Sequence, residues 1–311
     1  MTSSPERHHK LKPVAPGAGK WWDIEHIRYL VQTGFAVFIA VLIYNRAVSD
    51  LSGPSAPTSP EAYCPLGGFE TLYKYVTSGG QFISHAHLSN LVLFVAVLVT
   101  AVFAKSFFCG WICPLGAIQQ AITGFRRWVQ KRVSALGCIA IWLGRQTKPA
   151  AFLDRWFRYA KYLVLAWIIW GTVTYGEMVF RDVDPWAALL NIVESQSGIG
   201  FWVLIGTLVV SLFGDRPWCR YLCPLGAIIG VVGKLSFVKV QRESSVCIGC
   251  KWCTRECPMD LPVHAKSRVA AVECNMCLSC VDACPAGGAL ELRFSLLGTK
   301  HEGAQPEKVK P

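Results

Sequence analysis

Four long apolar stretches with few charges divide this chain into membrane-like and polar segments. They lie at about residues 29–48, 88–106, 160–180 and 197–214. A membrane-spanning helix needs about 20 mostly apolar residues, and about 17 is the lower limit. The pattern therefore predicts four transmembrane helices. The third stretch is free of charge only over 162–176, so it depends on Lys161 extending to the interface; a buried helix of a soluble domain is its alternative.

The composition supports a membrane protein with a soluble appendage. Hydrophobic residues make up 52% of the 311 positions, charged residues make up 16%, and the mean hydropathy is +0.36. A soluble domain usually has about 25% charged residues. The net charge of +11 does not by itself indicate nucleic acid as a partner, because the positions of the charges follow the expected spans, and we expect no nucleic-acid binding.

The basic residues predict the topology. Residues 105–161 carry ten Lys or Arg and one acid, Asp154, whereas 49–87 and 177–194 each carry one basic residue among several acids. The positive-inside rule places the 105–161 connection and both termini in the cytoplasm. We therefore expect a cytoplasmic tail at 1–28, a membrane domain at 29–240, and a disordered tail at 296–311.

An internal repeat surrounds two pairs of cysteines. Cys-Gly-Trp-Ile-Cys-Pro-Leu-Gly-Ala-Ile at 109–118 recurs as Cys-Arg-Tyr-Leu-Cys-Pro-Leu-Gly-Ala-Ile at 219–228. The C-x3-C-P motifs at 109–114 and 219–224 each follow an even-numbered span, which suggests pseudo-twofold halves. Cysteines four positions apart share one helical face. Cys109, Cys113, Cys219 and Cys223 are thus candidates for an additional metal centre or for redox dithiols; small buried residues at a bend are the alternative.

Two further cysteine runs, near the C-terminus, predict iron–sulfur chemistry. Each reads C-x2-C-x2-C-x3-C-P, at 247–258 and at 274–285. This is the ligand run of a ferredoxin with two 4Fe–4S clusters, in which the fourth cysteine of each run binds the other cluster. Zinc sites and disulfide frameworks fit the duplicated four-cysteine run poorly. The expected ligand sets in a domain at 241–295 are Cys247, Cys250, Cys253 and Cys284 for one cluster, and Cys274, Cys277, Cys280 and Cys257 for the other.

Two histidines are weaker candidates. His85 and His87 precede the second span on its expected outer side. Histidine titrates near neutral pH, so the pair could contact a quinol headgroup or take up its protons; an ordinary interfacial pair is the alternative. Cys64 and Cys138 lie outside the paired motifs, and we expect structural roles for both.

The four spans, the segments FFCGWICPLGAI and PWCRYLCPLGAI, and the double ferredoxin run together resemble the NapH-type membrane quinol dehydrogenase family. The same core resembles the membrane part of the nitrous oxide reductase activator family and the ferredoxin-type protein of methylamine utilisation. The resemblance covers roughly residues 20–295 and implies a multi-pass protein of the bacterial inner membrane. It also implies two 4Fe–4S clusters, contact with membrane lipid and the quinone pool, and a partner iron–sulfur or cytochrome protein leading to a terminal reductase.

Three functions remain open from the sequence. The first is a quinol dehydrogenase subunit that oxidises quinol and passes electrons to a partner redox protein of an anaerobic or periplasmic respiratory pathway. The second is a maturation factor, in which the C-x3-C-P cysteines reduce or deliver a metal for an assembling reductase or oxidase. The third is a scaffold that holds a ferredoxin-like partner at the membrane.

Overall fold

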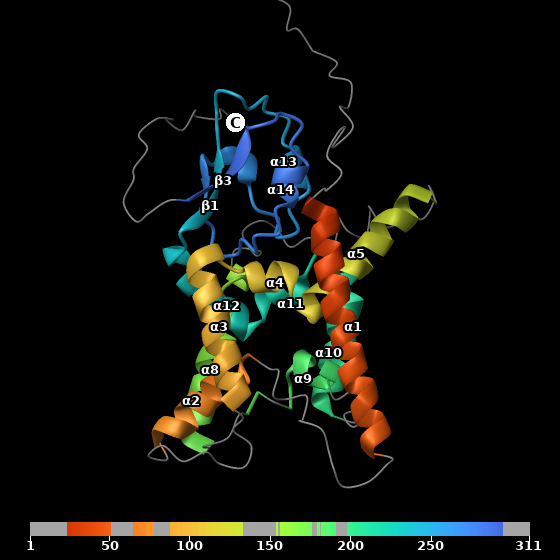
Figure 1. The fold of residues 1–311 in the computed structure, drawn as a ribbon, viewed down its shortest axis with the longest axis vertical. Helices are drawn as coiled ribbons and strands as arrows, with labels where there is room; N and C mark the ends of the chain where they lie inside the picture. Colours follow the sequence, from red (N-terminus) through yellow and green to blue (C-terminus); the bar gives the residue numbers. More distant parts are fainter. Residues whose placement is uncertain are drawn as a thin grey trace, which may run out of the picture.

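The protein consists of a helical part and a small domain with a three-stranded sheet, which lie one above the other in Figure 1. The structure, a computed structural model, describes residues 24–50, 65–77, 88–132, 154, 156–175, 179–180, 182–190 and 198–294. Statements about contacts and elements below concern these residues.

A helix occupies each region where the apolar pattern predicts a span. These helices are α1 (Ile24–Asp50), α3 (Leu88–Ala104), α8 (Ala160–Tyr175) and α10 (Ile199–Ser211). Helix α1 begins before the expected start at 29, whereas the other three end before their expected limits. Among the described residues, one helix has the length and composition to cross a membrane, over Ile24–Asn45. The four-span topology therefore stays a prediction.

The two C-x3-C-P motifs fold alike, as their shared sequence predicts. A five-residue helix, α4 (Phe107–Trp111) or α11 (Pro217–Tyr221), precedes a helix that starts at the motif's proline, α5 (Pro114–Arg132) or α12 (Pro224–Val232). The backbone N–H of Cys113 donates to Phe108 O at 3.0 Å, and that of Cys223 donates to Trp218 O at 3.0 Å. Proline suits the first position of a helix, because that position needs no N–H.

The two halves of the repeat are crossed in space. Helix α3 of the first half packs against α12 of the second, and α10 of the second half packs against α5 of the first. Helix α8 joins the α3–α12 side and α1 joins the α5–α10 side. Figure 1 shows these two groups with α4 and α11 lying across the space between them.

Two short helices complete the helical part. Helix α2 (Gly67–Thr77) packs on α3, and α9 (Pro185–Leu190) packs on α10 between the two groups. Leu66 and Phe180 join Leu115 and Trp218 in one buried apolar cluster. Leu66 and Phe180 belong to the acidic connections 49–87 and 177–194. These connections thus contact the helices that carry the cysteine motifs.

The C-terminal domain is a ferredoxin-type unit. Its sheet has the antiparallel order β2 (Arg268–Val269), β1 (Val238–Arg242) and β3 (Leu290–Phe294). The helices α13 (Trp252–Arg255) and α14 (Ser279–Asp282) and the 3-10 turn η3 (Val263–Ala265) complete it. The 3-10 turn η2 (Gly233–Leu235) directly follows α12 and packs on α3. Its small core includes Val240, Leu261 and Val269, each at most 4% exposed.

Buried basic side chains attach this domain to the helical part. Lys105 Nζ donates to the carbonyl oxygens of Val269 at 3.1 Å and Ala271 at 3.2 Å. Arg28 Nη1 donates to Cys277 O at 2.9 Å, and Trp111 Nε1 donates to Met276 O at 2.9 Å. Hydrogen bonds from charged donors are stronger than neutral ones, so these contacts fix the second cysteine run on α1 and α4.

Gly110 marks the closest approach between the two parts. A Cβ atom at this position would lie 2.3 Å from Asn275 O, which is backbone and cannot rotate away. We predict that Gly110→Ala lowers stability by about 1–3 kcal/mol, the usual cost of overpacking. The loss of cluster absorbance on heating measures this effect in detergent-purified protein. Gly124→Ala on α5 is the matched control, because its Cβ would meet nothing within 4 Å; equal melting temperatures for the two variants would contradict the prediction.

Candidate iron–sulfur sites

The two ferredoxin runs have the same backbone. Gly249 and Met276 occupy matching positions with φ of 72° and 50°, and Lys251 and Leu278 match with φ of 61° and 59°. The left-handed conformation is uncommon outside glycine, and strained residues persist where the surroundings fix them. Here the N–H of Gly249 points at the Cys247 sulfur, and that of Met276 points at the Cys274 sulfur. The strained turns therefore aim backbone donors at the predicted ligands.

Each expected ligand set lines a cavity of its own. The first cavity, of about 360 Å³, is lined by Cys247, Cys250, Cys253 and Cys284. The second, of about 340 Å³, is lined by Cys257, Cys274, Cys277 and Cys280. The structure thus brings together thiols from both runs in the crossed pattern that the sequence predicts. The donor sets fit 4Fe–4S clusters, for which four cysteine sulfurs are the usual ligands.

The thiols of the second set influence one another. Burial and the nearby thiols of Cys277 and Cys274 raise the pKa of Cys257 to about 12, although backbone N–H groups oppose this shift. Burial and the thiols of Cys277, Cys274 and Cys257 raise the pKa of Cys280, and Cys253 of the first set adds to this effect. The two cavities are therefore close enough for their cysteines to interact.

Each ligand set offers four cysteine sulfurs. Four cysteines around one zinc must all reach the same atom, whereas a 4Fe–4S cluster offers a different iron to each sulfur. Among the described residues, no group of three or more His, Cys, Asp or Glu is placed to hold one metal ion.

The two ferredoxin cavities differ in their distance from the helical part. Three cysteines of the second set lie in or directly after the segment that Lys105 and Trp111 hold, and one of them, Cys277, is buried. The first set contains the exposed Cys250. We call the second cavity the inner cavity and the first the outer cavity; the outer one thus includes an exposed thiol.

A third cavity lies beneath the inner one. It measures about 830 Å³, open mouth included, and all four C-x3-C-P cysteines line it. The sequence repeat predicts that these cysteines face one another, and the structure brings them together. Glu273 and Asn275, on either side of Cys274, also line this cavity. The third cavity is thus in direct contact with the inner ligand loop.

The four thiols in the third cavity are partly buried. Burial and neighbouring thiols raise the pKa of Cys109 and of Cys223 well above the usual value. Burial and Cys219 raise the pKa of Cys113 to about 12, although the N–H groups of Leu115 and Gly116 oppose this shift. Without a bound cation these side chains would be neutral thiols at ordinary pH.

Charged side chains that the sequence pattern does not indicate also line this cavity. Arg216 is 1% exposed and Lys161 is 2% exposed, and both line it. Asp184 also lines it, and burial raises its carboxyl pKa to about 7. In the sequence, Lys161 lies at the edge of an apolar stretch, and no pattern there shows that its side chain faces cysteines.

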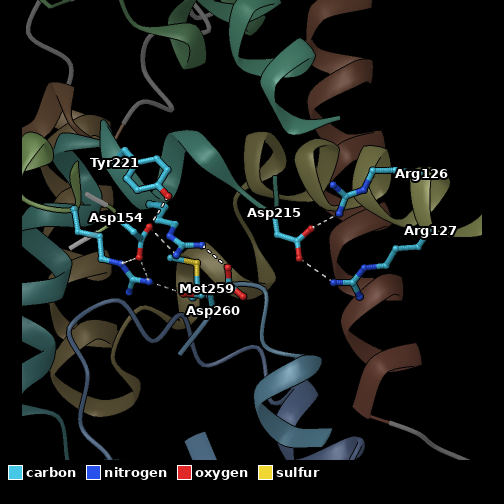
Figure 2. A network of polar contacts seen from close by, with 9 residues as sticks. Arg126, Arg127, Asp154, Asp215, Tyr221, Met259 and Asp260 are labelled. Carbon is cyan, nitrogen blue, oxygen red and sulfur yellow. Dashed lines mark hydrogen bonds and ion pairs between the residues drawn. The ribbon is translucent and has the colours of Figure 1, made fainter. Parts of the chain in front are cut away.

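A polar network holds the second motif in position, as Figure 2 shows. Asp215 pairs with Arg126 at 3.1 Å and with Arg127 at 2.8 Å, both from α5. Arg220, between the motif's two cysteines, pairs with Asp154 at 2.8 Å and with Asp260 of the ferredoxin-type domain at 3.0 Å. Arg126 and Arg127, two of the basic residues that predict a cytoplasmic connection, thus also form specific ion pairs.

Two lesser predictions fall outside the described residues. These are the candidates His85 and His87, and the structural roles of Cys64 and Cys138. Pro65 and Leu66, which directly follow Cys64, do line the third cavity.

Comparisons with known proteins agree with the cysteine chemistry. A family model described as "4Fe-4S binding domain" matches residues 86–133 and 196–242, and one described as "4Fe-4S dicluster domain" matches 239–285. The fold and these matches define an iron–sulfur electron-transport protein of the ferredoxin type.

Relatives narrow this class. YccM of Escherichia coli (strain K12) is 32% identical over 81% of this chain and 68% of its own length. The ferredoxin-type protein NapH of Haemophilus influenzae is 29% identical over 61% of this chain and 63% of its own length. The methylamine utilization ferredoxin-type protein MauN of Methylorubrum extorquens is 28% identical over 77% of this chain and 75% of its own. The chain belongs to the NapH-type family of ferredoxin-type proteins. No solved structure matches it.

The crossed ligand sets predict which cysteine variants affect the same cluster. Cys284→Ser should alter the same electron paramagnetic resonance signal as Cys250→Ser, because both residues line the outer cavity. Cys257→Ser should alter the same signal as Cys277→Ser, because both line the inner one. If Cys284→Ser grouped with Cys277→Ser instead, each run would hold its own cluster and the crossed assignment would be wrong.

Proposed function

We propose that this chain is a quinol dehydrogenase subunit of a bacterial inner membrane, which oxidises quinol and passes the electrons to a partner redox protein. The observation that carries the proposal is the row of three cysteine-lined cavities. It leads from between the helices, through the inner ligand loop, to the exposed Cys250. Bound 4Fe–4S clusters supply one-electron chemistry. The partner is an iron–sulfur or cytochrome protein that leads to a terminal reductase.

The exposed faces of the helices support a four-span membrane domain. Soluble proteins rarely expose large contiguous apolar patches. Here each of the four long apolar helices presents large apolar side chains outward, at 36–73% exposure. Examples, one from each of α1, α3, α8 and α10, are Leu30, Val92, Leu163 and Trp202. Lipid would cover these faces and would bring quinol to the third cavity from the side.

The chain's own residues perform the positioning. Lys105, Arg28 and Trp111 hold the inner ligand loop against the helices, and the strained turns direct N–H groups at the ligands. Such donors and the depth of burial tune the reduction potential of iron–sulfur centres. We assign the inner ligands to Cys257, Cys274, Cys277 and Cys280, and the outer ligands to Cys247, Cys250, Cys253 and Cys284.

A second function uses the same third cavity. As a maturation factor, the protein would reduce or deliver a metal through Cys109, Cys113, Cys219 and Cys223. The observation that favours it is the set of four partly buried thiols in one cavity with an open mouth. Electron transport by the ferredoxin-type domain would then serve the client's metal.

The topology is testable directly. Alkaline phosphatase or green fluorescent protein fused after residue 45, 104, 175 or 214 should report outside, inside, outside and inside, respectively. The physical reason is the ten basic residues of 105–161, which favour the cytoplasm. Fluorescence from a fusion after residue 294 should place the ferredoxin-type domain inside. A periplasmic report from that fusion would overturn the proposed localisation.

Quinol oxidation is testable with the full chain in nanodiscs. Under anaerobic conditions, a short-chain quinol with an oxidised acceptor protein should bleach the cluster absorbance of the wild type at a rate that saturates with quinol. Replacing all four C-x3-C-P cysteines by serine should slow this bleaching at least tenfold, while Cys138→Ser should not. Unchanged bleaching together with failed metallation of a client reductase would favour the maturation factor. No bleaching of the wild type would overturn the main proposal.

A further inference from the structure

Two buried basic side chains line the third cavity, and the hydrogen-bond acceptors of one of them are neutral. Arg216 and Lys161 are both almost fully buried, and the acids Glu273 and Asp184 line the same cavity. Lys161 lies 3.9 Å from Glu273, whereas Arg216 donates to Cys109 O at 2.7 Å and to Gln120 Oε1 at 2.6 Å. Buried charges are normally paired with opposite charges, so the position of Arg216 favours a nearby anion.

The two cations face the four cysteines. Arg216 acts electrostatically on the thiols of Cys109, Cys113 and Cys219. Lys161 acts on those of Cys109 and Cys223. Thiolates at these positions would supply the missing negative charge, but four adjacent thiolates repel one another unless a cation binds them. A metal centre with four thiolate ligands satisfies both demands.

Polar groups are aimed at the sulfurs as well. Gly226 N donates to Cys223 Sγ at 3.4 Å, and the N–H groups of Leu115 and Gly116 point at Cys113. Gln119 is 0% exposed, and its amide favours the thiolate of Cys219. Its Nε2 and Oε1 have no hydrogen-bond partner of ordinary geometry among the described residues. Hydrogen bonds to sulfur are characteristic of iron–sulfur sites.

The four thiols are arranged like those of the inner ligand set. In both sets the thiols interact with their neighbours across two separate sequence motifs. The two motifs of the third set also lie in the segments that match the "4Fe-4S binding domain" model. An iron–sulfur centre is therefore the metal centre that these cysteines favour.

We propose that Cys109, Cys113, Cys219 and Cys223 together hold a third iron–sulfur cluster, which neither copy of the repeat could hold alone. Each segment that matches the "4Fe-4S binding domain" model carries only one cysteine pair, so a complete ligand set requires both. An iron–sulfur core held by four thiolates is negatively charged, because the thiolates outweigh the charge of the core. Arg216 and Lys161 then act as its counter-charges.

Iron analysis of the full chain tests this proposal without any assay of quinol turnover. Anaerobically purified protein should contain about 12 iron and 12 sulfide per chain if the third cluster is of the 4Fe–4S type, or about 10 of each if it is of the 2Fe–2S type. A value of about 8 iron, with or without one zinc or copper, would overturn it. A failure of quinol oxidation would leave this count unaffected, so the two proposals fail separately.

Variants then locate the cluster. Cys109→Ser combined with Cys219→Ser should remove about 4 of 12 iron, or about 2 of 10, and keep the spectroscopic signals of the inner and outer clusters. Cys138→Ser is the matched control and should keep all the iron. Unchanged iron in the double variant would contradict the assignment to these cysteines.

A substitution of Lys161 leaves all four cysteine ligands in place. Lys161→Gln should keep the full iron content and shift the midpoint potential of one cluster signal to more negative values, because a positive charge near that cluster is lost. Lys234→Gln, at an exposed position in the 3-10 turn η2, should shift none. Equal potentials in the wild type and Lys161→Gln would show that no redox centre lies beside Lys161.

Discussion

The hold of the helical part on the second cysteine run is the contact on which the rest of the structure depends. Lys105, Arg28 and Trp111 donate to backbone carbonyl oxygens within residues 269–277. Because these acceptors belong to the backbone, substitutions of side chains in the ferredoxin-type domain do not remove them. Gly110 lets the two backbones approach without a Cβ between them. This contact puts the inner cavity directly above the third one. The proposed electron transport between the helices and the ferredoxin-type domain needs this closeness.

The crossed repeat explains why the third cavity exists. Because α3 packs on α12 and α10 packs on α5, the short helices α4 and α11 meet in the middle of the helical part. Each brings one cysteine pair, and Arg216 connects the two by donating to Cys109 O. Asp215 and Arg220 hold the second motif through ion pairs on both sides of the short helix α11. A duplicated sequence thus forms one site at its internal interface.

Much of this arrangement could be predicted from local sequence signals. The spacing of the ferredoxin runs predicts which cysteines line the same cavity, because it admits few alternatives. Helices also lie where the apolar stretches predict them. The buried cations could not be predicted. Arg28 sits at the end of an apolar stretch like any interfacial charge, yet its partner is 249 residues away. Leu66 and Phe180 lie in connections whose charge pattern indicates only a side of the membrane, not a place in the core.

The crossing of the halves also has a consequence for biogenesis. Helix α3 emerges early in synthesis, but its packing partner α12 ends only at Val232. The first half therefore cannot complete its hydrophobic contacts until most of the chain has been made, and long-range contacts of this kind slow folding. A fragment ending before α12 would leave the apolar surface of α3 that packs on α12 uncovered. Either half expressed alone would be a substrate for proteases rather than a smaller working unit.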